Sequence, residues 1–330
     1  MDSVEIKSVA ELVKPVEIGA HVVAAVFLRG EAAFATGTGE IVFANGKRVK
    51  AHENGGILEA VSDGERIVTT GDDGRLVETF ANGVTHTIAE VQNKWIDHVA
   101  LGPDDAVAWS AGKTAFVRTK KGERSVEVAN TVGGLAFAPK GFRLAISHYN
   151  GVSLWFPNSE AKPDFLEWKG SHLCVRWSAD GNFLVTTMQE PALHGWRLPD
   201  KKHMRMTGYP SRIRSTSFSH DGKWLATSGA DTVVMWPFGS KDGPMGKAPH
   251  MLAAARREQR VSCVACNPGG PVVAIGYTDG SVKIARIEDG AEIVVRGPEG
   301  GEVTTLAWSP GPKGNLAFGT DEGKAGILVL

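Results

Sequence analysis

The chain has 330 residues, and its 36 Lys and Arg residues nearly balance its 37 Asp and Glu residues. The net charge of −1 excludes a global electrostatic attraction to nucleic acid or to an anionic membrane. The sequence has no apolar run of the ~20 residues that cross a bilayer, and its acidic start, Met1–Glu5, differs from a secretory signal. Three cysteines are too few for a disulfide framework, so we expect a cytoplasmic protein.

A short apolar strand that ends in a large residue, followed by a turn of Ser, Asp, Pro or Gly, recurs eight times along the chain. The last apolar residues of these strands, here called the anchors, are Phe27, Val61, Leu101, Phe137, Trp177, Phe218, Cys266 and Trp308. Their mean separation is about 40 residues, the period of four-stranded propeller blades. The repeat therefore predicts an all-β fold.

Each repeat continues in the same order after its anchor. A second strand of small apolar residues leads to a tight turn, such as Asn150-Gly151 or Asp279-Gly280, in which Asn-Gly and Asp-Gly favour a hairpin. A third strand ends near a tryptophan, as at Trp155, and a more polar fourth strand closes the unit. An insertion at residues 239–249 lengthens one repeat.

This pattern resembles the WD40-repeat β-propeller family over nearly the whole chain. The family's Trp-Asp and Gly-His dipeptides are degraded to Trp155-Phe156, Trp196-Arg197, Trp236-Pro237, Ala20-His21, Ala51-His52 and Ser171-His172. No repeat has the complete Asp–His–Ser/Thr–Trp network of the family. The resemblance implies one propeller domain over residues 1–330, with structural roles for the histidines before the first strands.

The repeats predict eight blades, with seven as the alternative. The last unit stops after three strands at Leu330, whereas residues 13–18 alternate between apolar and polar before the first unit. We expect this N-terminal segment to pair with Ile327–Leu330 and to close the ring in the last blade, because closure covers edges that would otherwise pair with other chains. Pro15 is acceptable there, since an outermost strand has one edge facing solvent.

No motif in the sequence points to catalysis or to a cofactor. Cys263 and Cys266 form a Cys-x-x-Cys pair without a second pair, so they are interpreted as buried small apolar residues and no metal is expected. The sequence lacks a Gly-x-Ser-x-Gly elbow, a His-Glu-x-x-His motif and a phosphate-binding glycine loop. We therefore expect no enzyme activity.

The function that the resemblance implies is a non-enzymatic scaffold that binds one or more proteins, with a monomer favoured. Loops between fourth and first strands, and between second and third strands, share one face of such a fold and bear its function. The expected protein-binding residues on that face are Trp95, His148, Tyr149, His172, Gln189, Tyr209, Arg212, Arg214, Arg260 and Tyr277. Tyr149 and Tyr277 occupy equivalent turns, and the run Arg256–Arg260 adds positive charge near Arg212 and Arg214.

Two other functions stay open at this point. The first is an enzyme or small-molecule binder with its site at the mouth of the central channel, because some propellers use residues from several blades there. The second is an adaptor associated with nucleic acid, which the net charge disfavours although a local basic patch can suffice.

Overall fold

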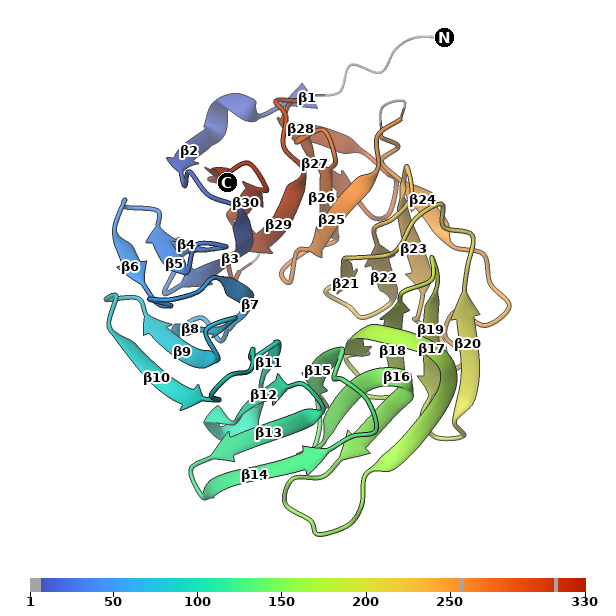
Figure 1. Cartoon of the computed structure of the whole chain (residues 1–330). Coiled ribbons are helices and arrows are strands. Elements are labelled where there is room, and N and C mark those ends of the chain that lie inside the picture. The colour runs from blue at the N-terminus through green and yellow to red at the C-terminus, as the bar shows by residue number, and fades with distance from the viewer. Residues whose placement is uncertain (1–6, 256–257, 312–313) are drawn as a thin grey trace. The chain divides into compact units, whose positions relative to one another are not determined.

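The computed structural model describes residues 7–255, 258–311 and 314–330, and their regular secondary structure is almost entirely β-strand (Figure 1). The only helical segments in those ranges are two short 3-10 helices, η1 (Ala10–Leu12) and η2 (Pro103–Asp105). Two compact units divide the chain: the first comprises Met1–Gly37, Ile41–Arg48 and Arg214–Leu330, and the second comprises Thr38–Glu40 and Val49–Ile213. The predicted all-β class is confirmed.

Four sheets belong to the first unit, although three residues of their strands, Glu40, Val49 and Lys50, are assigned to the second unit. Their strand orders are β3 (Val22–Leu28), β4 (Glu31–Thr36), β5 (Glu40–Phe43), β6 (Arg48–Lys50); β21 (Thr216–Phe218), β22 (Trp224–Thr227), β23 (Val233–Pro237), β24 (His250–Leu252); β1 (Lys7–Ser8), β28 (Glu292–Arg296), β27 (Val282–Arg286), β26 (Val272–Tyr277), β25 (Val261–Cys266); and β2 (Val13–Glu17), β31 (Lys324–Leu328), β30 (Leu316–Thr320), β29 (Val303–Trp308).

The second unit contains three sheets, of which one has six strands. Their strands are β7 (Ile57–Ser62), β8 (Arg66–Gly71), β9 (Arg75–Phe80), β10 (Thr85–Glu90); β11 (His98–Leu101), β12 (Val107–Ala111), β13 (Thr114–Thr119), β14 (Gly122–Glu127); and β15 (Gly134–Phe137), β16 (Leu144–Trp155), β17 (Asp164–Trp177), β18 (Phe183–Met188), β19 (Leu193–Arg197), β20 (Lys202–Met206). Their sequential order within each sheet is that of antiparallel meanders.

The prediction of eight blades is wrong: the described residues form seven sheets, and seven blades was the alternative. All eight repeat anchors lie in strands, as predicted. The fourth and fifth repeat units share one sheet, because the continuous strand β17 pairs with β16 of the fourth unit and with β18 of the fifth. Each of these two long strands therefore spans two of the predicted short ones.

The predicted pairing of the N-terminal segment with the last strand is confirmed. β2 runs antiparallel to β31, with Val13 opposite Leu328 and Glu17 opposite Lys324. The Arg48 guanidinium donates from Nη2 to the carbonyl oxygens of Glu17 and Ile18, at 3.1 Å and 2.9 Å. The preceding strand β1 pairs in parallel with β28, which the sequence did not predict. This segment thus completes one sheet and extends another in the first unit.

Tryptophan anchors connect consecutive repeats inside each unit. Trp177 Nε1 donates to the carbonyl oxygen of Ala136 at 3.0 Å, and Trp308 Nε1 donates to that of Ala265 at 2.8 Å. In both cases the acceptor lies in the first strand of the preceding repeat. Because the indole rings are large and mostly removed from water, each of these contacts combines apolar burial with a satisfied polar group.

His52 forms a buried network that matches three of the four members of the family's polar network. His52 Nδ1 lies 2.9 Å from Asp73 Oδ1, and His52 Nε2 lies 2.9 Å from Thr69 Oγ1. Since an ionised carboxylate can only accept, Nδ1 donates to Asp73, and the Thr69 hydroxyl in turn donates to the Val77 carbonyl oxygen at 3.3 Å. His52 is fully buried, so its predicted structural role is confirmed, although the tryptophan member is absent from this network.

Deletion of residues 1–20 is expected to destabilise the protein and to cause aggregation, because it removes β2 and leaves the edge of β31 unpaired. Burial of Ile18, which is 2% exposed, alone stabilises the fold by about 2 kcal/mol. Thermal unfolding followed by circular dichroism, with size-exclusion chromatography, measures both effects. Removal of residues 1–6 alone is the control, since it leaves β1 and β2 intact. Equal melting temperatures for the 1–20 deletion and the full chain would contradict the stabilising role of β2.

Candidate functional site

A surface depression in the second unit is the candidate binding site. Its volume is about 540 Å³. The residues that line it are Tyr149, Trp168, Lys169, Gly170, Ser171, Met188, Gln189, Glu190 and Arg205. They come from β16, β17 and β20 and from the end of β18 and the turn after it. Two of them, Tyr149 and Gln189, are exposed residues that the sequence predicted to bind a protein.

Backbone geometry holds Tyr149 at the surface. The next two residues, Asn150 and Gly151, have φ values of 70° and 148°, in the left-handed region that Asn and Gly adopt with least strain. The Tyr149 carbonyl oxygen accepts hydrogen bonds from His148 Nδ1 at 2.9 Å and from Asn130 Nδ2 at 3.4 Å. With its backbone fixed, the Tyr149 side chain is still 46% exposed.

A glycine is required at the base of the depression. Gly170 has a φ of 125°, and a Cβ atom at this position would lie 2.6 Å from Met188 Cε. The adjacent Ser171 accepts a hydrogen bond at its carbonyl oxygen from the Gln189 backbone N–H, at 3.0 Å. Residues Trp168–Ser171 of β17, here called the β17 crossing, and the turn after β18 therefore lie close together around Met188.

A cluster of histidines and tryptophans supports Trp168. The Trp168 ring stacks on His194 with 4.0 Å between ring centroids, and His194 Nε2 lies 3.1 Å from His203 Nδ1. His172 donates from Nε2 to the Trp168 carbonyl oxygen at 2.9 Å, and its Nδ1 lies 2.7 Å from Thr186 Oγ1. These contacts fix both the backbone and the ring of Trp168.

Burial keeps the inner histidines neutral. Desolvation, with smaller contributions from His203 and His172, lowers the pKa of His194 to about 3. Desolvation also lowers the pKa of His172 and of His148. A neutral imidazole has one donor and one acceptor, which agrees with the partners of His172. The cluster therefore supports the depression without adding charge to it.

The His194 cluster is expected to make the protein less stable in acid. A histidine whose folded pKa lies below its unfolded value of about 6.5 stabilises the fold fully above that pH, and this contribution is lost as the pH falls toward 3. His194→Phe keeps an aromatic ring against Trp168 but cannot be protonated. We expect this variant to lose less stability than the wild type between pH 7 and pH 4.5, by about 2 kcal/mol, as measured by urea unfolding. His220→Gln, at an exposed turn, is the control, and an unchanged pH dependence in His194→Phe would contradict the assignment.

Four of the predicted binding residues are buried, which corrects the prediction for them. These residues are His148, His172, Tyr209 and Tyr277, with exposed fractions between 1% and 8%. The Tyr277 hydroxyl donates to the Ala253 carbonyl oxygen at 2.7 Å, so its ring points inward, unlike that of Tyr149. The repeat register located the turns correctly, but it does not determine which way a side chain in a turn points.

The other predicted residues are exposed but do not line the depression. Arg212 donates from Nη1 to Gln189 Oε1 at 3.1 Å, which brings it to the rim. Trp95, in the same unit, is 60% exposed. Arg214 and Arg260 belong to the first unit, where Arg214 Nη1 lies 3.5 Å from Glu302 Oε1. Arg256 and Arg257 of the predicted basic run lie outside the described residues.

The sequence did not predict seven residues that line the depression: Trp168, Lys169, Gly170, Ser171, Met188, Glu190 and Arg205. Trp168 lies in β17 and Arg205 in β20, the fourth strand of the next repeat. The available signal was Gly170 directly after Trp168 and Lys169, because a glycine inside a strand pattern marks a close backbone approach.

The cysteines and acidic groups do not form a metal site in the described ranges. No three His, Cys, Asp or Glu residues there are grouped so that they could hold a metal ion. Cys263 and Cys266 are buried, as interpreted from the sequence, and burial raises the pKa of Cys266 to about 12. Over the same residues, no helix has the length and apolar character needed to span a membrane.

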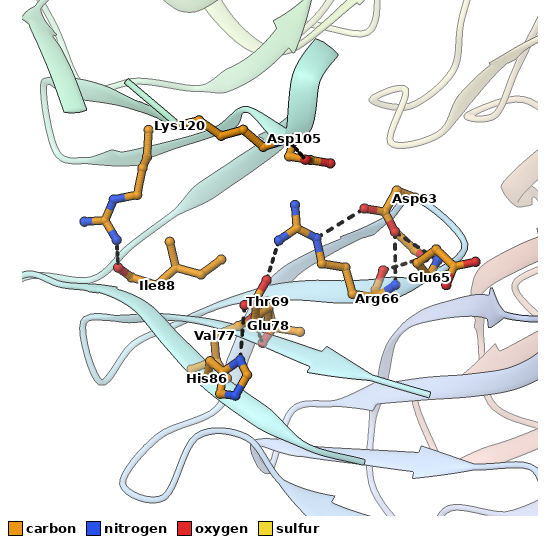
Figure 2. A network of polar contacts seen from close by, with 12 residues as sticks. Asp63, Glu65, Arg66, Thr69, Val77, Glu78, His86, Ile88, Asp105 and Lys120 are labelled. Atoms are coloured by element: carbon orange, nitrogen blue, oxygen red, sulfur yellow. Dashed lines mark hydrogen bonds and ion pairs between the residues drawn. The ribbon is translucent and has the colours of Figure 1, made fainter. Parts of the chain in front are cut away.

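A second polar cluster, on the sheet of β7 to β10, has a structural role (Figure 2). Arg66 lies between two carboxylates: its Nε is 3.2 Å from Asp63 Oδ2, and its Nη1 donates to Glu78. Burial opposes ionisation of Asp63, but hydrogen bonds from the backbone N–H groups of Arg66 and Glu65 and from the Arg66 side chain lower its pKa. His86 lies 3.4 Å from the other oxygen of Glu78. The cluster thus joins β8, β9 and β10.

The chain is similar to known WD40 proteins. The family model "WD domain, G-beta repeat" matches residues 201–236 and 250–284. A curated relative, the small ribosomal subunit protein RACK1z of Oryza sativa subsp. japonica, is 26% identical over 125 residues. This match spans 37% of the present chain and only 37% of the relative's length.

The similarity to a solved structure extends over nearly the whole chain. The crystal structure of the computationally designed Ika8 protein matches with a TM-score of 0.74 at 16% identity, covering 95% of this chain and 98% of that one. At this identity the match concerns the fold alone. Together with the repeats, it agrees with the all-β propeller class. The chain carries WD40 repeats at residues 201–236 and 250–284, and the predicted resemblance to the WD40-repeat β-propeller family is confirmed.

Proposed function

We propose that the protein is a non-enzymatic scaffold that binds a partner protein at the Tyr149 depression. WD40 repeats support an interaction role in general terms. The rice relative is named as a protein of the small ribosomal subunit, which is an assembly of many components. Because the match spans 37% of that relative, its partners are not transferred to this chain. A cytoplasmic location agrees with the free thiols of Cys174, Cys263 and Cys266.

The observation that carries the proposal is an exposed aromatic ring beside a depression with an apolar base and a charged rim. Tyr149 is 46% exposed, and Trp168 and Met188 contribute apolar surface next to it. Tyrosine, tryptophan and arginine dominate the binding energy of many protein interfaces when a partner excludes water from them. Hydrogen bonds to the carbonyl oxygens of Tyr149 and Ser171 already fix the backbone here, so little conformational entropy is lost when a partner binds.

The two other functions from the sequence have distinct signatures. An enzyme or small-molecule binder would show a melting temperature that rises with a metal ion or metabolite. A nucleic-acid adaptor would bind RNA or DNA with an affinity that falls steeply with salt. No contact in the described part of the chain favours either of them over a protein partner.

Tyr149→Ala is expected to weaken binding of the partner at least tenfold, about 1.4 kcal/mol, without lowering the melting temperature, because the side chain is exposed. The partner is first identified in the native cell with a photo-crosslinking amino acid at position 149, and it is then purified and titrated by calorimetry. Val84, equally exposed at 46%, lies between β9 and β10 and provides the control for both steps.

Two results would contradict the proposed function. One is a set of crosslinked products at position 149 that equals the set at position 84. The other is a purified partner whose affinity is the same for the wild type and for Tyr149→Ala. A crosslink at position 149 to a nucleic acid would instead favour the adaptor function.

A further inference from the structure

The depression has a charge of its own, which differs in sign from that of the whole chain. Lys169 and Arg205 are exposed lining residues, and in the described ranges neither side chain makes a hydrogen bond or ion pair. Arg212 is also exposed, and its Nη1 donates to the neutral amide of Gln189 at the rim. Glu190 is the one carboxylate among the lining residues. Three cations thus surround one anion on a chain whose net charge is −1.

Unpaired surface cations of this kind differ from the paired ones elsewhere in the second unit. Arg66 lies between Asp63 and Glu78, Arg118 pairs with Glu123, and Arg124 pairs with Glu160. Glu190, the one carboxylate among the residues that line the depression, is not bonded to Lys169 or Arg205. A ligand with negative charge would therefore gain partners there without displacing an existing ion pair.

Apolar surface accompanies the positive charge. The Tyr149 ring, the half-buried Trp168 ring and Met188 border the same depression. A volume of about 540 Å³ accommodates a few amino-acid side chains rather than a folded domain. Trp168 is rigid because it stacks on His194 and its carbonyl oxygen accepts from His172.

We propose that the Tyr149 depression binds an acidic peptide segment of the partner, with one aromatic or large aliphatic side chain seated against Tyr149, Trp168 and Met188. Carboxylates beside this side chain pair with Lys169, Arg205 and Arg212. The inference rests on the proposed function, and it adds the chemistry of the partner. An aromatic flanked by acidic residues satisfies both features of the depression, whereas a nucleic-acid strand would need an extended basic track that the net charge of the chain does not favour.

Selection from a random peptide library displayed on phage, against the immobilised full chain, tests this chemistry. We expect the selected peptides to be enriched in Asp and Glu around one aromatic or large aliphatic residue. The double reversal Lys169→Glu with Arg205→Glu should shift the selection toward Lys and Arg. The control Lys140→Glu with Lys201→Glu changes the net charge equally, at two exposed positions outside the depression, and should leave the selection unchanged.

A synthetic peptide with the selected sequence then gives the affinities. Fluorescence anisotropy should show binding at least about tenfold weaker for the double reversal than for the control pair, and weaker binding at higher salt. Tyr149→Ala should also weaken it. Selected peptides that are neutral or basic, or affinities equal for the double reversal and the control, would overturn the inference.

These experiments distinguish a failure of this inference from a failure of the proposed function. Neutral or basic peptides that lose binding in Tyr149→Ala would overturn the acidic chemistry and leave the depression as a protein-binding site. Peptides that are unaffected by Tyr149→Ala, or the absence of any selected peptide, would count against both.

Discussion

The backbone pairing of Tyr149 with Ser171 is the contact on which the candidate site depends. It lies where the continuous strand β17 passes from β16 of the fourth repeat unit to β18 of the fifth, and it brings Trp168 and Gly170 of β17 beside Tyr149. The turn after β18 is then held to the same crossing by the hydrogen bond from Gln189 to Ser171. Because these links are made by the backbone, the depression is formed before any partner arrives, and binding orders few additional groups.

Neighbouring repeats are held together by contacts that do not need the family's dipeptides. Trp177 and Trp308 bind carbonyl oxygens of the preceding repeat in the second and first units, respectively. The buried histidines also have partners, as His52 does with Thr69 and Asp73. An unpaired buried polar group costs about 1–3 kcal/mol, so these networks stabilise the sheets even though the family's signature residues are degraded.

The sequence predicted the repeats and the pairing of β2 with β31, because both follow from patterns that recur or alternate along the chain. It did not predict the joined sheet, which arises because β17 continues without a break from its pairing with β16 to its pairing with β18. Nor did it predict that Tyr149 is exposed whereas Tyr277 is buried. Both occupy the expected turns, but only the Tyr277 hydroxyl donates to a buried carbonyl oxygen, that of Ala253. About half of the predicted contact residues are exposed, whereas Arg205 was missed because it approaches the depression from another strand.

In the candidate site, one set of residues fixes the geometry and another set supplies the charge. Burial favours the neutral forms of His172 and His194, so they hold Trp168 in place without repelling a cation or attracting an anion. Lys169 and Arg205 are exposed to water and supply the positive charge. Since surface charges are screened within about 8 Å at physiological ionic strength, this local positive charge acts on a segment that has already reached the depression. A chain with almost no net charge can thus discriminate between partners at one place on its surface.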